Sequence, residues 1–244
     1  REDNRRISRT SRKRKREKRI QHDRELRKNT GIREARQVPV FQEPKALPSL
    51  SIQPAGQFIE PKMCYVCKFR FTQVHFFYDG MCPECADFNY QKRFQTAPLD
   101  GRTALVTGGR VKIGFQSALK LLRAGARTLV STRFPQDAAL RFSREEDFGV
   151  WKHRLQIHGL ALRHSPSVEI FCQYLLNTEG RLDFLINNAA QTVRKPPGFY
   201  RHLMEWELKP AKDLPEALLP LLASHENFKR ALETAHLSPP EKNI

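Results

Sequence analysis

The sequence predicts an α/β protein with a partial parallel sheet of about four strands, preceded by a small four-cysteine module and a disordered or extended basic arm. Short apolar runs at 102–107, 127–132, 157–162 and 182–187 each have the length of a buried strand. Helical patterns lie between these runs, and strands that alternate with helices form right-handed crossovers and a parallel sheet. Two Cys-x-x-Cys pairs and a strongly basic segment precede this region.

Composition divides the chain of 244 residues into five segments. We expect a basic arm over 1–37, a proline-rich linker over 38–62, the cysteine module over 63–97, a truncated α/β domain over 98–195 and a helical, proline-rich tail over 196–244. No apolar run reaches the ~20 residues that a bilayer span requires, so no membrane partner is expected.

The basic arm is the strongest electrostatic feature of the chain. Residues 1–37 hold sixteen Lys or Arg against six Asp or Glu, which is +10 of the total net charge of +17. Such a segment binds phosphates by displacing their counterions, so RNA is the expected partner. The candidate RNA-binding residues are Arg12, Lys13, Arg14, Lys15, Arg16, Lys18 and Arg19. A solvated tail or a nuclear localisation signal over 12–16 is the alternative.

Four of the five cysteines form two pairs, Cys64 with Cys67 and Cys82 with Cys85. Each pair offers two thiolates from one tight turn, and two such turns make the tetrahedral sulfur site that Zn²⁺ favours. A strand or hairpin over 68–78 is expected to join the pairs and a helix over 86–94 to follow them, so we predict a structural Zn²⁺ site. The alternatives are a disulfide, a redox pair, or a ligand set that includes His75.

A glycine-rich loop and an asparagine-rich segment carry a family resemblance. The stretch Thr107-Gly108-x-x-x-x-Ile113-Gly114 and the segment Asn187-Asn188-Ala189-Ala190, with a βαβ order between them, resemble the short-chain dehydrogenase/reductase family. The resemblance covers about 100–195 and implies a Rossmann-like fold that binds NADP(H). It assigns to the cofactor Gly108, Gly109, Arg110, Lys112, Ile113, Gly114, Arg133, Asn188, Ala189 and Ala190.

Lys112 departs from the family pattern, and Arg133 bears on which cofactor the resemblance implies. The family has a third glycine where this chain has Lys112, and a lysine there either reaches a phosphate or blocks the loop. The resemblance places Arg133, just past the second strand, where the 2′-phosphate of NADP is recognised.

The catalytic residues of the same family are not found. The family uses a tyrosine with a lysine four residues later to transfer a proton, and no Tyr-x-x-x-Lys occurs in this sequence. We therefore assign no catalytic residue and expect a truncated, non-catalytic dehydrogenase fold. The apolar edge of its sheet would need cover from the tail or from a partner.

The leading interpretation is a structural or assembly component of a large ribonucleoprotein, such as a ribosome. Its arm would bind ribosomal RNA, and its dehydrogenase-like domain, a pseudoenzyme, would contact neighbouring proteins. The mitochondrion is the expected compartment because the Arg- and Ser-rich start resembles the remnant of a transit peptide, with the cytoplasm or nucleus as alternatives. The alternative functions are an NADP-dependent oxidoreductase of the short-chain type with a zinc-binding extension, and a nuclear zinc-finger regulator.

Overall fold

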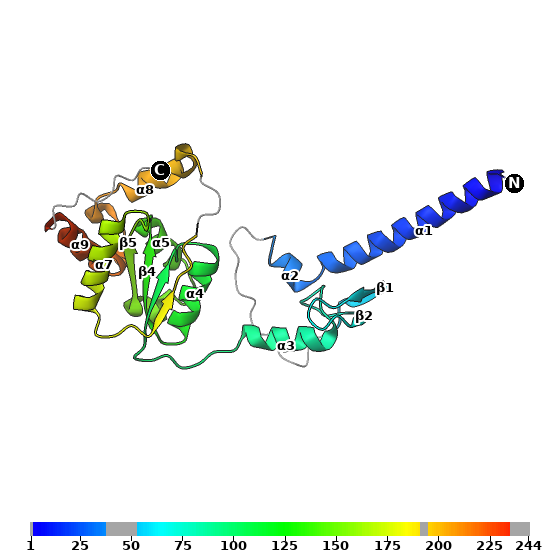
Figure 1. Ribbon diagram of the computed structural model, residues 1–244, viewed down its shortest axis with the longest axis horizontal. Helices are drawn as coiled ribbons and strands as arrows, with labels where there is room; N and C mark the ends of the chain where they lie inside the picture. Colours follow the sequence, from blue (N-terminus) through cyan, green and yellow to red (C-terminus); the bar gives the residue numbers. More distant parts are fainter. Residues whose placement is uncertain (1, 38–52, 191–194, 235–244) are drawn as a thin grey trace. The chain divides into compact units, whose positions relative to one another are not determined.

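A computed structural model of the chain describes residues 2–37, 53–190 and 195–234. The chain divides into two compact units, Arg1–Gln95 and Thr96–Ile244 (Figure 1). The first unit contains a two-stranded sheet and the second a four-stranded sheet. Among the described residues, no helix combines the length and the apolar character that crossing a membrane requires.

The first unit begins with a long helix, α1 (Glu2–Lys28), so the prediction of a disordered or extended arm is wrong over these residues. Arg, Lys and Glu are good helix formers, and their unbranched side chains lose little rotamer freedom in a helix. The C-terminal part of α1 is held on strand β1 (Gly56–Met63). The Asp23 carboxylate accepts a hydrogen bond from the backbone N–H of Ile59 and pairs with Lys62 at 2.9 Å.

Strand β1 pairs antiparallel with β2 (Arg70–Val74), so the predicted linker is wrong over 56–62. Residues 38–52 of the predicted linker lie outside the described residues. The register of the two strands shifts between Gln57 and Lys62. Proline lacks the N–H that a ladder needs, and Pro61 lies within this irregularity.

Two helices complete the first unit. The short helix α2 (Gly31–Glu34) follows α1, and its residues Gly31 and Ile32 donate backbone hydrogen bonds to the carbonyls of Phe76 and Phe77. Helix α3 (Pro83–Arg93) begins at a proline, whose fixed φ suits the first helical turn.

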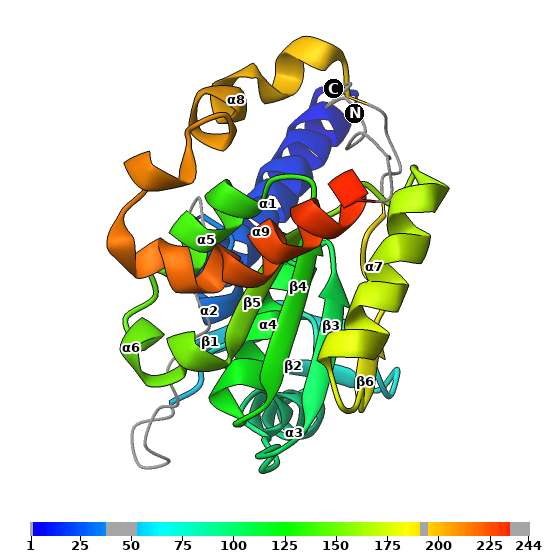
Figure 2. The same cartoon turned by 90° about the vertical axis from the view of Figure 1, so that its left-hand side faces the viewer.

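The second unit contains four parallel strands in the order β5-β4-β3-β6. The strands are β3 (Thr103–Thr107), β4 (Arg127–Thr132), β5 (Leu155–Gly159) and β6 (Phe184–Ile186). This arrangement confirms the predicted α/β fold with a partial, Rossmann-like parallel sheet (Figure 2). Strands β3 and β4 are almost continuously buried because helices cover both faces of the sheet.

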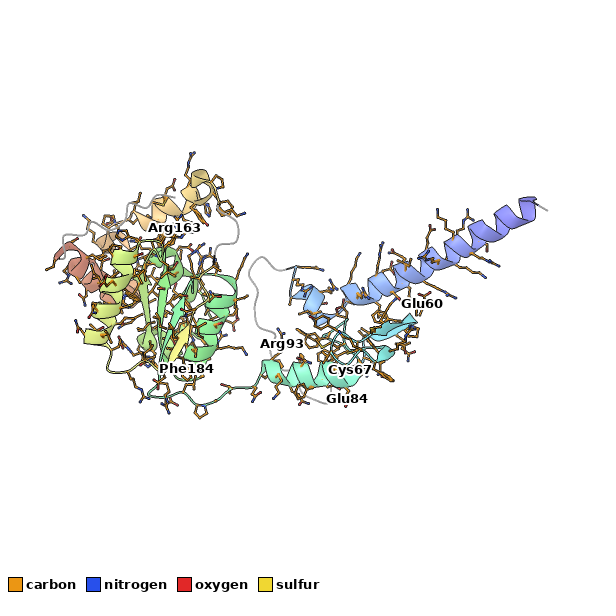
Figure 3. The ribbon with its side chains drawn as sticks, in the orientation of Figure 1. Glu60, Cys67, Glu84, Arg93, Arg163 and Phe184 are labelled. Carbon is orange, nitrogen blue, oxygen red and sulfur yellow. The ribbon has the colours of Figure 1, made fainter. Side chains whose placement is uncertain are left out.

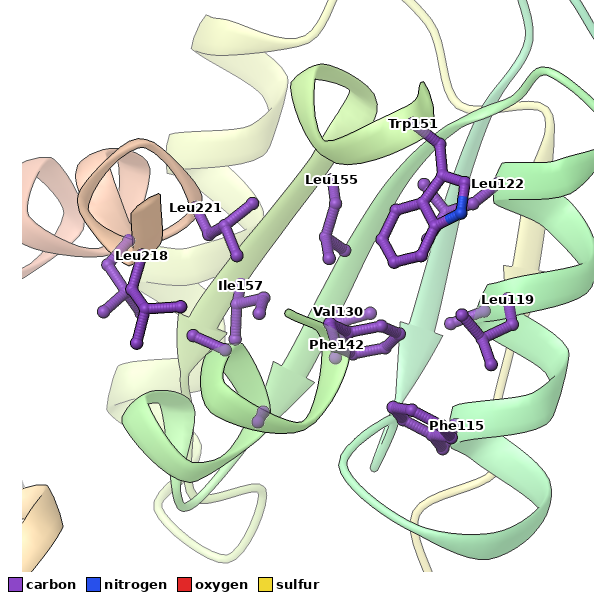
Figure 4. Close-up of a cluster of buried hydrophobic side chains, with 14 of the residues drawn as sticks. Phe115, Leu119, Leu122, Val130, Phe142, Trp151, Leu155, Ile157, Leu218 and Leu221 are labelled. Atoms are coloured by element: carbon purple, nitrogen blue, oxygen red, sulfur yellow. The ribbon is translucent and has the colours of Figure 1, made fainter. Parts of the chain in front are cut away.

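Helices connect the strands. They are α4 (Lys112–Arg123), α5 (Pro135–Phe142), α6 (Phe148–Trp151) and α7 (Ser165–Thr178). The main helix of the connection between β4 and β5 is α5, which begins at Pro135, only three residues after β4 ends. On one face of the sheet, Val130 packs with Phe115, Phe142 and Trp151 (Figure 4).

The tail covers one edge and part of one face of the sheet. Its helices are α8 (Arg201–Glu207) and α9 (Leu219–Thr234), and α9 packs against β5 and α7 (Figure 2). Phe228 of α9 joins a core cluster with Leu129 and Phe171. The strand at the other edge, β6, is more open, with Phe184 37% and Leu185 54% exposed.

Candidate metal-binding and nucleotide-binding sites

The four clustered cysteines lie close together in the first unit. The ligand atoms of Cys64, Cys67, Cys82 and Cys85 all lie within 4.8 Å of one another. The sulfur atoms of Cys67 and Cys82 are 3.7 Å apart, near the ~3.8 Å that follows from tetrahedral Zn–S bonds. A disulfide requires about 2.05 Å, and all five cysteines are free thiols. The cluster therefore has a donor set and a spacing that could bind a metal ion.

Backbone hydrogen bonds in the cluster stabilise the thiolate form of Cys64 relative to its thiol form. Burial raises the pKa of the Cys64 thiol, but backbone N–H groups of Cys82, Cys67 and Val66 outweigh it and lower that pKa to about 6. The hydrogen bond with Cys82 and then burial raise the pKa of the Cys85 thiol to about 12. Four thiolates at this spacing repel one another unless a cation lies between them, so the site fits a divalent metal.

His75 is not part of the sulfur cluster. Its Nδ1 atom accepts hydrogen bonds from the backbone N–H groups of Phe77 and Tyr78 at 3.0 and 3.1 Å. Its Nε2 atom lies 3.2 Å from the Asp87 carboxylate. Burial lowers the pKa of His75, partly offset by Asp87. The ring therefore organises the loop after β2.

The second site is a cavity of about 680 Å³ in the second unit. Its walls come from the carboxyl ends of the strands, the segments that follow them and the tail, at 108, 110–113, 131–134, 160–163, 188–190 and 200. Ligands of open α/β sheets bind at the carboxyl ends of the strands, and the volume lies in the range of small-molecule sites. Figure 3 shows Arg163, after β5, and Phe184, at the start of β6, at opposite ends of the sheet.

The structure brings most of the predicted cofactor residues into this wall. Those that line the cavity are Gly108, Arg110, Lys112, Ile113, Arg133, Asn188, Ala189 and Ala190. Gly109 and Gly114 lie behind the wall, where they allow close packing. A Cβ atom on Gly109 would lie 2.7 Å from Cγ1 of Val130, and one on Gly114 would lie 2.5 Å from the carbonyl oxygen of Gly108.

The glycine loop and the asparagine segment are cross-linked by hydrogen bonds. The side-chain amide of Asn188 donates to the carbonyl oxygens of Thr107 and Gly108 at 3.0 and 3.2 Å. The hydroxyl of Thr107 accepts from the backbone N–H groups of Asn188 and Ala189, both at 3.0 Å. Gly108 has φ +68, and a Cβ there would lie 2.9 Å from Cα of Ala189. The two motifs therefore build one rigid corner.

Lys112 occupies a left-handed backbone conformation, with φ 54, at the start of α4. This conformation costs a non-glycine residue roughly 1–2 kcal/mol, which explains why the family has glycine at this position. The side chain is exposed and lines the cavity. The cavity has a volume of about 680 Å³ with the lysine in its wall.

Positive charge dominates the wall. Arg110, Lys112, Arg133 and Arg163 line the cavity, and no acidic residue does so among the described residues. Arg110 pairs with Asp137 at 2.6 Å, which leaves the other three cations without an acidic partner in the described part of the chain. Burial raises the pKa of Asp137, but hydrogen bonds from Arg141 and Arg110 outweigh burial, and the net effect lowers the pKa. The carboxylate therefore stays charged. The cavity is therefore suited to an anion.

Arg163 and Tyr200 are among the wall residues that sequence reasoning missed. Arg163 follows β5 much as Arg133 follows β4, and this parallel is a signal that the sequence contains. Tyr200 comes from the distant tail, so no local pattern points to it. The Arg133 guanidinium lies 4.9 Å from the centre of the Tyr200 ring and donates to its hydroxyl at 3.1 Å. Tyr200 also packs on Phe134, with ring centres 5.1 Å apart.

No protein-family model matches the chain. The "Uncharacterized protein R665" of Acanthamoeba polyphaga mimivirus is 39% identical over 135 residues, which cover 53% of this chain and 29% of that protein. Dehydrogenase/reductase SDR family member 13 of Bos taurus is 38% identical over 95 residues, with 38% and 25% coverage. Retinol dehydrogenase 14 of Mus musculus is 37% identical over 101 residues, with 38% and 30% coverage.

Solved structures of similar proteins include the Pseudomonas aeruginosa RhlG/NADP active-site complex. It is 26% identical to this chain, with a TM-score of 0.34, and the match covers 55% of this chain and 50% of that one. The sequence similarities to dehydrogenases confirm the resemblance to the short-chain dehydrogenase/reductase family. The chain spans between 25% and 30% of the length of the three curated relatives described above.

Proposed function

We propose that the unit Thr96–Ile244 binds NADP(H), as the cofactor-binding part of an oxidoreductase of the short-chain dehydrogenase/reductase type. One observation carries the proposal: the cavity at the strand ends combines a tightly packed glycine loop with four cations and no acid among its described lining residues. For this unit, the oxidoreductase alternative is better supported than a role as a ribonucleoprotein scaffold.

Each part of the cofactor has a suitable partner in the wall. The pyrophosphate fits the glycine loop at Gly108, where the N-terminus of α4 offers unpaired N–H groups and a positive dipole. Arg133 supplies the charge for a 2′-phosphate, which NAD lacks. NADP(H), when bound, would donate or accept a hydride. No tyrosine in this sequence is followed by lysine four residues later, so the proposal assigns these residues to cofactor binding.

Titration of the full chain with NADPH, followed by the fluorescence of the nicotinamide, tests the proposal. We expect saturable binding that Arg133→Ala weakens at least tenfold for NADPH and much less for NADH. Gly114→Asp should abolish binding of both, because a side chain there meets the Gly108 carbonyl. Arg230→Ala, on an exposed arginine of α9, is the matched control. An absence of saturable binding to the wild-type chain would refute the proposal.

We propose as a second function that helix α1 binds RNA. The supporting observation is that residues 11–20 are all exposed and include the seven predicted contacts Arg12, Lys13, Arg14, Lys15, Arg16, Lys18 and Arg19. Within the described residues, Arg19 is the one among the seven that pairs with an acid, Glu60, at 3.5 Å. The wider proposal is that the protein is a component of a mitochondrial ribonucleoprotein, where it contacts ribosomal RNA and neighbouring proteins. That proposal rests on this helix.

Salt-dependent RNA binding by the full chain tests the second function. Neutralising Lys13, Lys15 and Lys18 together should reduce the slope of log K against log salt by about 2–3. The control is the same triple change at Lys120, Lys152 and Lys229 of the other unit. An unchanged salt slope would show that these lysines of α1 do not contact RNA and that α1 is a solvated helix.

A further inference from the structure

An exposed apolar surface lies on the first cysteine turn of the metal-binding cluster. We define the knuckle surface as Met63, Tyr65, Val66 and Phe69, which are 62%, 77%, 50% and 72% exposed. The aromatic residue Phe71, two positions further on, is 7% exposed and belongs to the core of the unit. Adjacent large apolar side chains left in water mark interaction sites more often than scattered ones do.

The backbone of the turn explains why these side chains lie outside the core. Cys64 donates its backbone N–H to the carbonyl of Phe69 at 2.8 Å, and Lys68 donates its own to the carbonyl of Cys64 at 3.1 Å. This closed turn buries Cys64 completely while Tyr65 and Val66, which lie between the paired cysteines, stay exposed. The exposure is therefore fixed by the same turn that assembles the sulfur cluster.

Positive charge accompanies the exposed rings. Between Glu60 and Asp79 the sequence contains Lys62, Lys68 and Arg70 and no acidic residue. The Lys68 ammonium lies 5.0 Å from the centre of the Tyr65 ring. Lys62 is engaged by Asp23, which leaves two exposed cations in this segment, Lys68 beside the Tyr65 ring and Arg70 next to Phe69 in the sequence. Flat apolar rings next to cations are complementary to a chain of bases joined by phosphates.

We propose that the knuckle surface binds single-stranded nucleic acid. The rings of Tyr65 and Phe69 stack on bases, and Lys68 and Arg70 contact the flanking phosphates. In a duplex the bases are already stacked on one another, so the rings select for single strands. This selectivity goes beyond cofactor binding and beyond the charge attraction of α1, which acts on any phosphate backbone.

The test uses the full, Zn²⁺-loaded chain and a fluorescein-labelled oligouridine of about 15 nucleotides, alone or paired with oligoadenosine. Fluorescence anisotropy should show tighter binding of the single strand. Tyr65→Ala with Phe69→Ala should weaken that binding at least about tenfold and leave the salt slope unchanged. Lys68→Ala with Arg70→Ala should instead lower the salt slope by about 1–2.

The controls separate loss of contact from loss of structure. Tyr65→Phe keeps the ring and should keep the affinity. Val150→Ala removes an apolar side chain of the other unit that is 68% exposed and should have no effect. The metal content of each variant should equal that of the wild type.

Three results would overturn the proposal. Equal affinity for single strand and duplex would remove the stacking argument. Unchanged binding by the Tyr65 and Phe69 variant, with loss in the α1 triple variant, would leave α1 as the whole site. Binding to phosphatidylserine vesicles that the aromatic variant loses, without loss of oligouridine binding, would make the surface a membrane contact.

Discussion

Acid should destabilise the unit Thr96–Ile244 through His158 of β5. The side chain is fully buried, and its ring packs against Phe171 and Phe228. Neither ring nitrogen has a hydrogen-bond partner in the described part of the chain. Burial lowers the pKa of His158 to about 4, with a smaller opposing effect from Glu179. The folded protein therefore resists protonation of a group that the unfolded chain protonates readily.

The magnitude follows from the two pKa values. An unfolded histidine titrates near ~6.5, so the pKa of His158 is about 2.5 units lower in the folded state. Between these values the unfolded state binds one more proton than the folded state, and stability falls by ~1.4 kcal/mol for each pH unit. The contribution is complete above pH ~6.5 and is lost as the pH falls towards 4, a total of ~3 kcal/mol.

Urea unfolding followed by tryptophan fluorescence measures this loss, because both tryptophans, Trp151 and Trp206, lie in the same unit. The wild type should lose ~2–3 kcal/mol more than His158→Phe between pH 7 and pH 4.5. His153→Phe, at an exposed histidine of the same unit, should follow the wild type. If His158→Phe and the wild type lose stability in parallel, His158 is not the group that titrates.

Three further predictions concern the metal cluster, the glycine loop and strand β6. Cys82→Ser should lose the bound metal in atomic absorption and the folded signal of the first unit in circular dichroism, whereas Cys172→Ser, at an exposed cysteine, should keep both. Lys112→Gly should raise the melting temperature, since glycine avoids a cost of ~1 kcal/mol. The same change should weaken NADPH binding, because the contact of Lys112 with a phosphate of the cofactor is lost. Equal NADPH affinity of the variant and the wild type would contradict that contact. Asp183→Asn should lower the melting temperature at neutral pH, because hydrogen bonds from Arg181, from the backbone N–H of Thr103 and from Arg102 hold the pKa of Asp183 well below its usual range. That difference should disappear as the pH falls and Asp183 itself becomes protonated, and a difference that persists in acid would exclude this mechanism.

The central strands could be read from the sequence because a parallel strand is buried on both faces. The run 127–132 is apolar for that reason, and it coincides with β4. Strand β1 was missed because it contains Glu60 and Pro61 and has one solvent-exposed face. Local pattern is weak in such strands, and only the pairing with β2 stabilises them.

Long-range contacts limit how much of the candidate sites can be predicted from the sequence. The cysteine cluster follows from spacing alone, since each pair is a local turn. Tyr200 reaches Arg133 from 67 positions along the chain, a separation that no motif encodes. The sequence does not predict that α1 is helical without a partner either, since its anchoring through Asp23 depends on the distant strand β1.

Backbone strain links the two candidate phosphate sites. Among the described residues, the non-glycine residues with positive φ are both lysines, Lys68 with φ 64 and Lys112 with φ 54. Glycine would adopt these conformations without the roughly 1–2 kcal/mol that a lysine loses. Strain of this kind is concentrated at functional sites, where a side chain contributes something glycine lacks. Here that contribution is a cation beside a surface proposed to bind phosphate, which gives a physical reason for lysine at both positions.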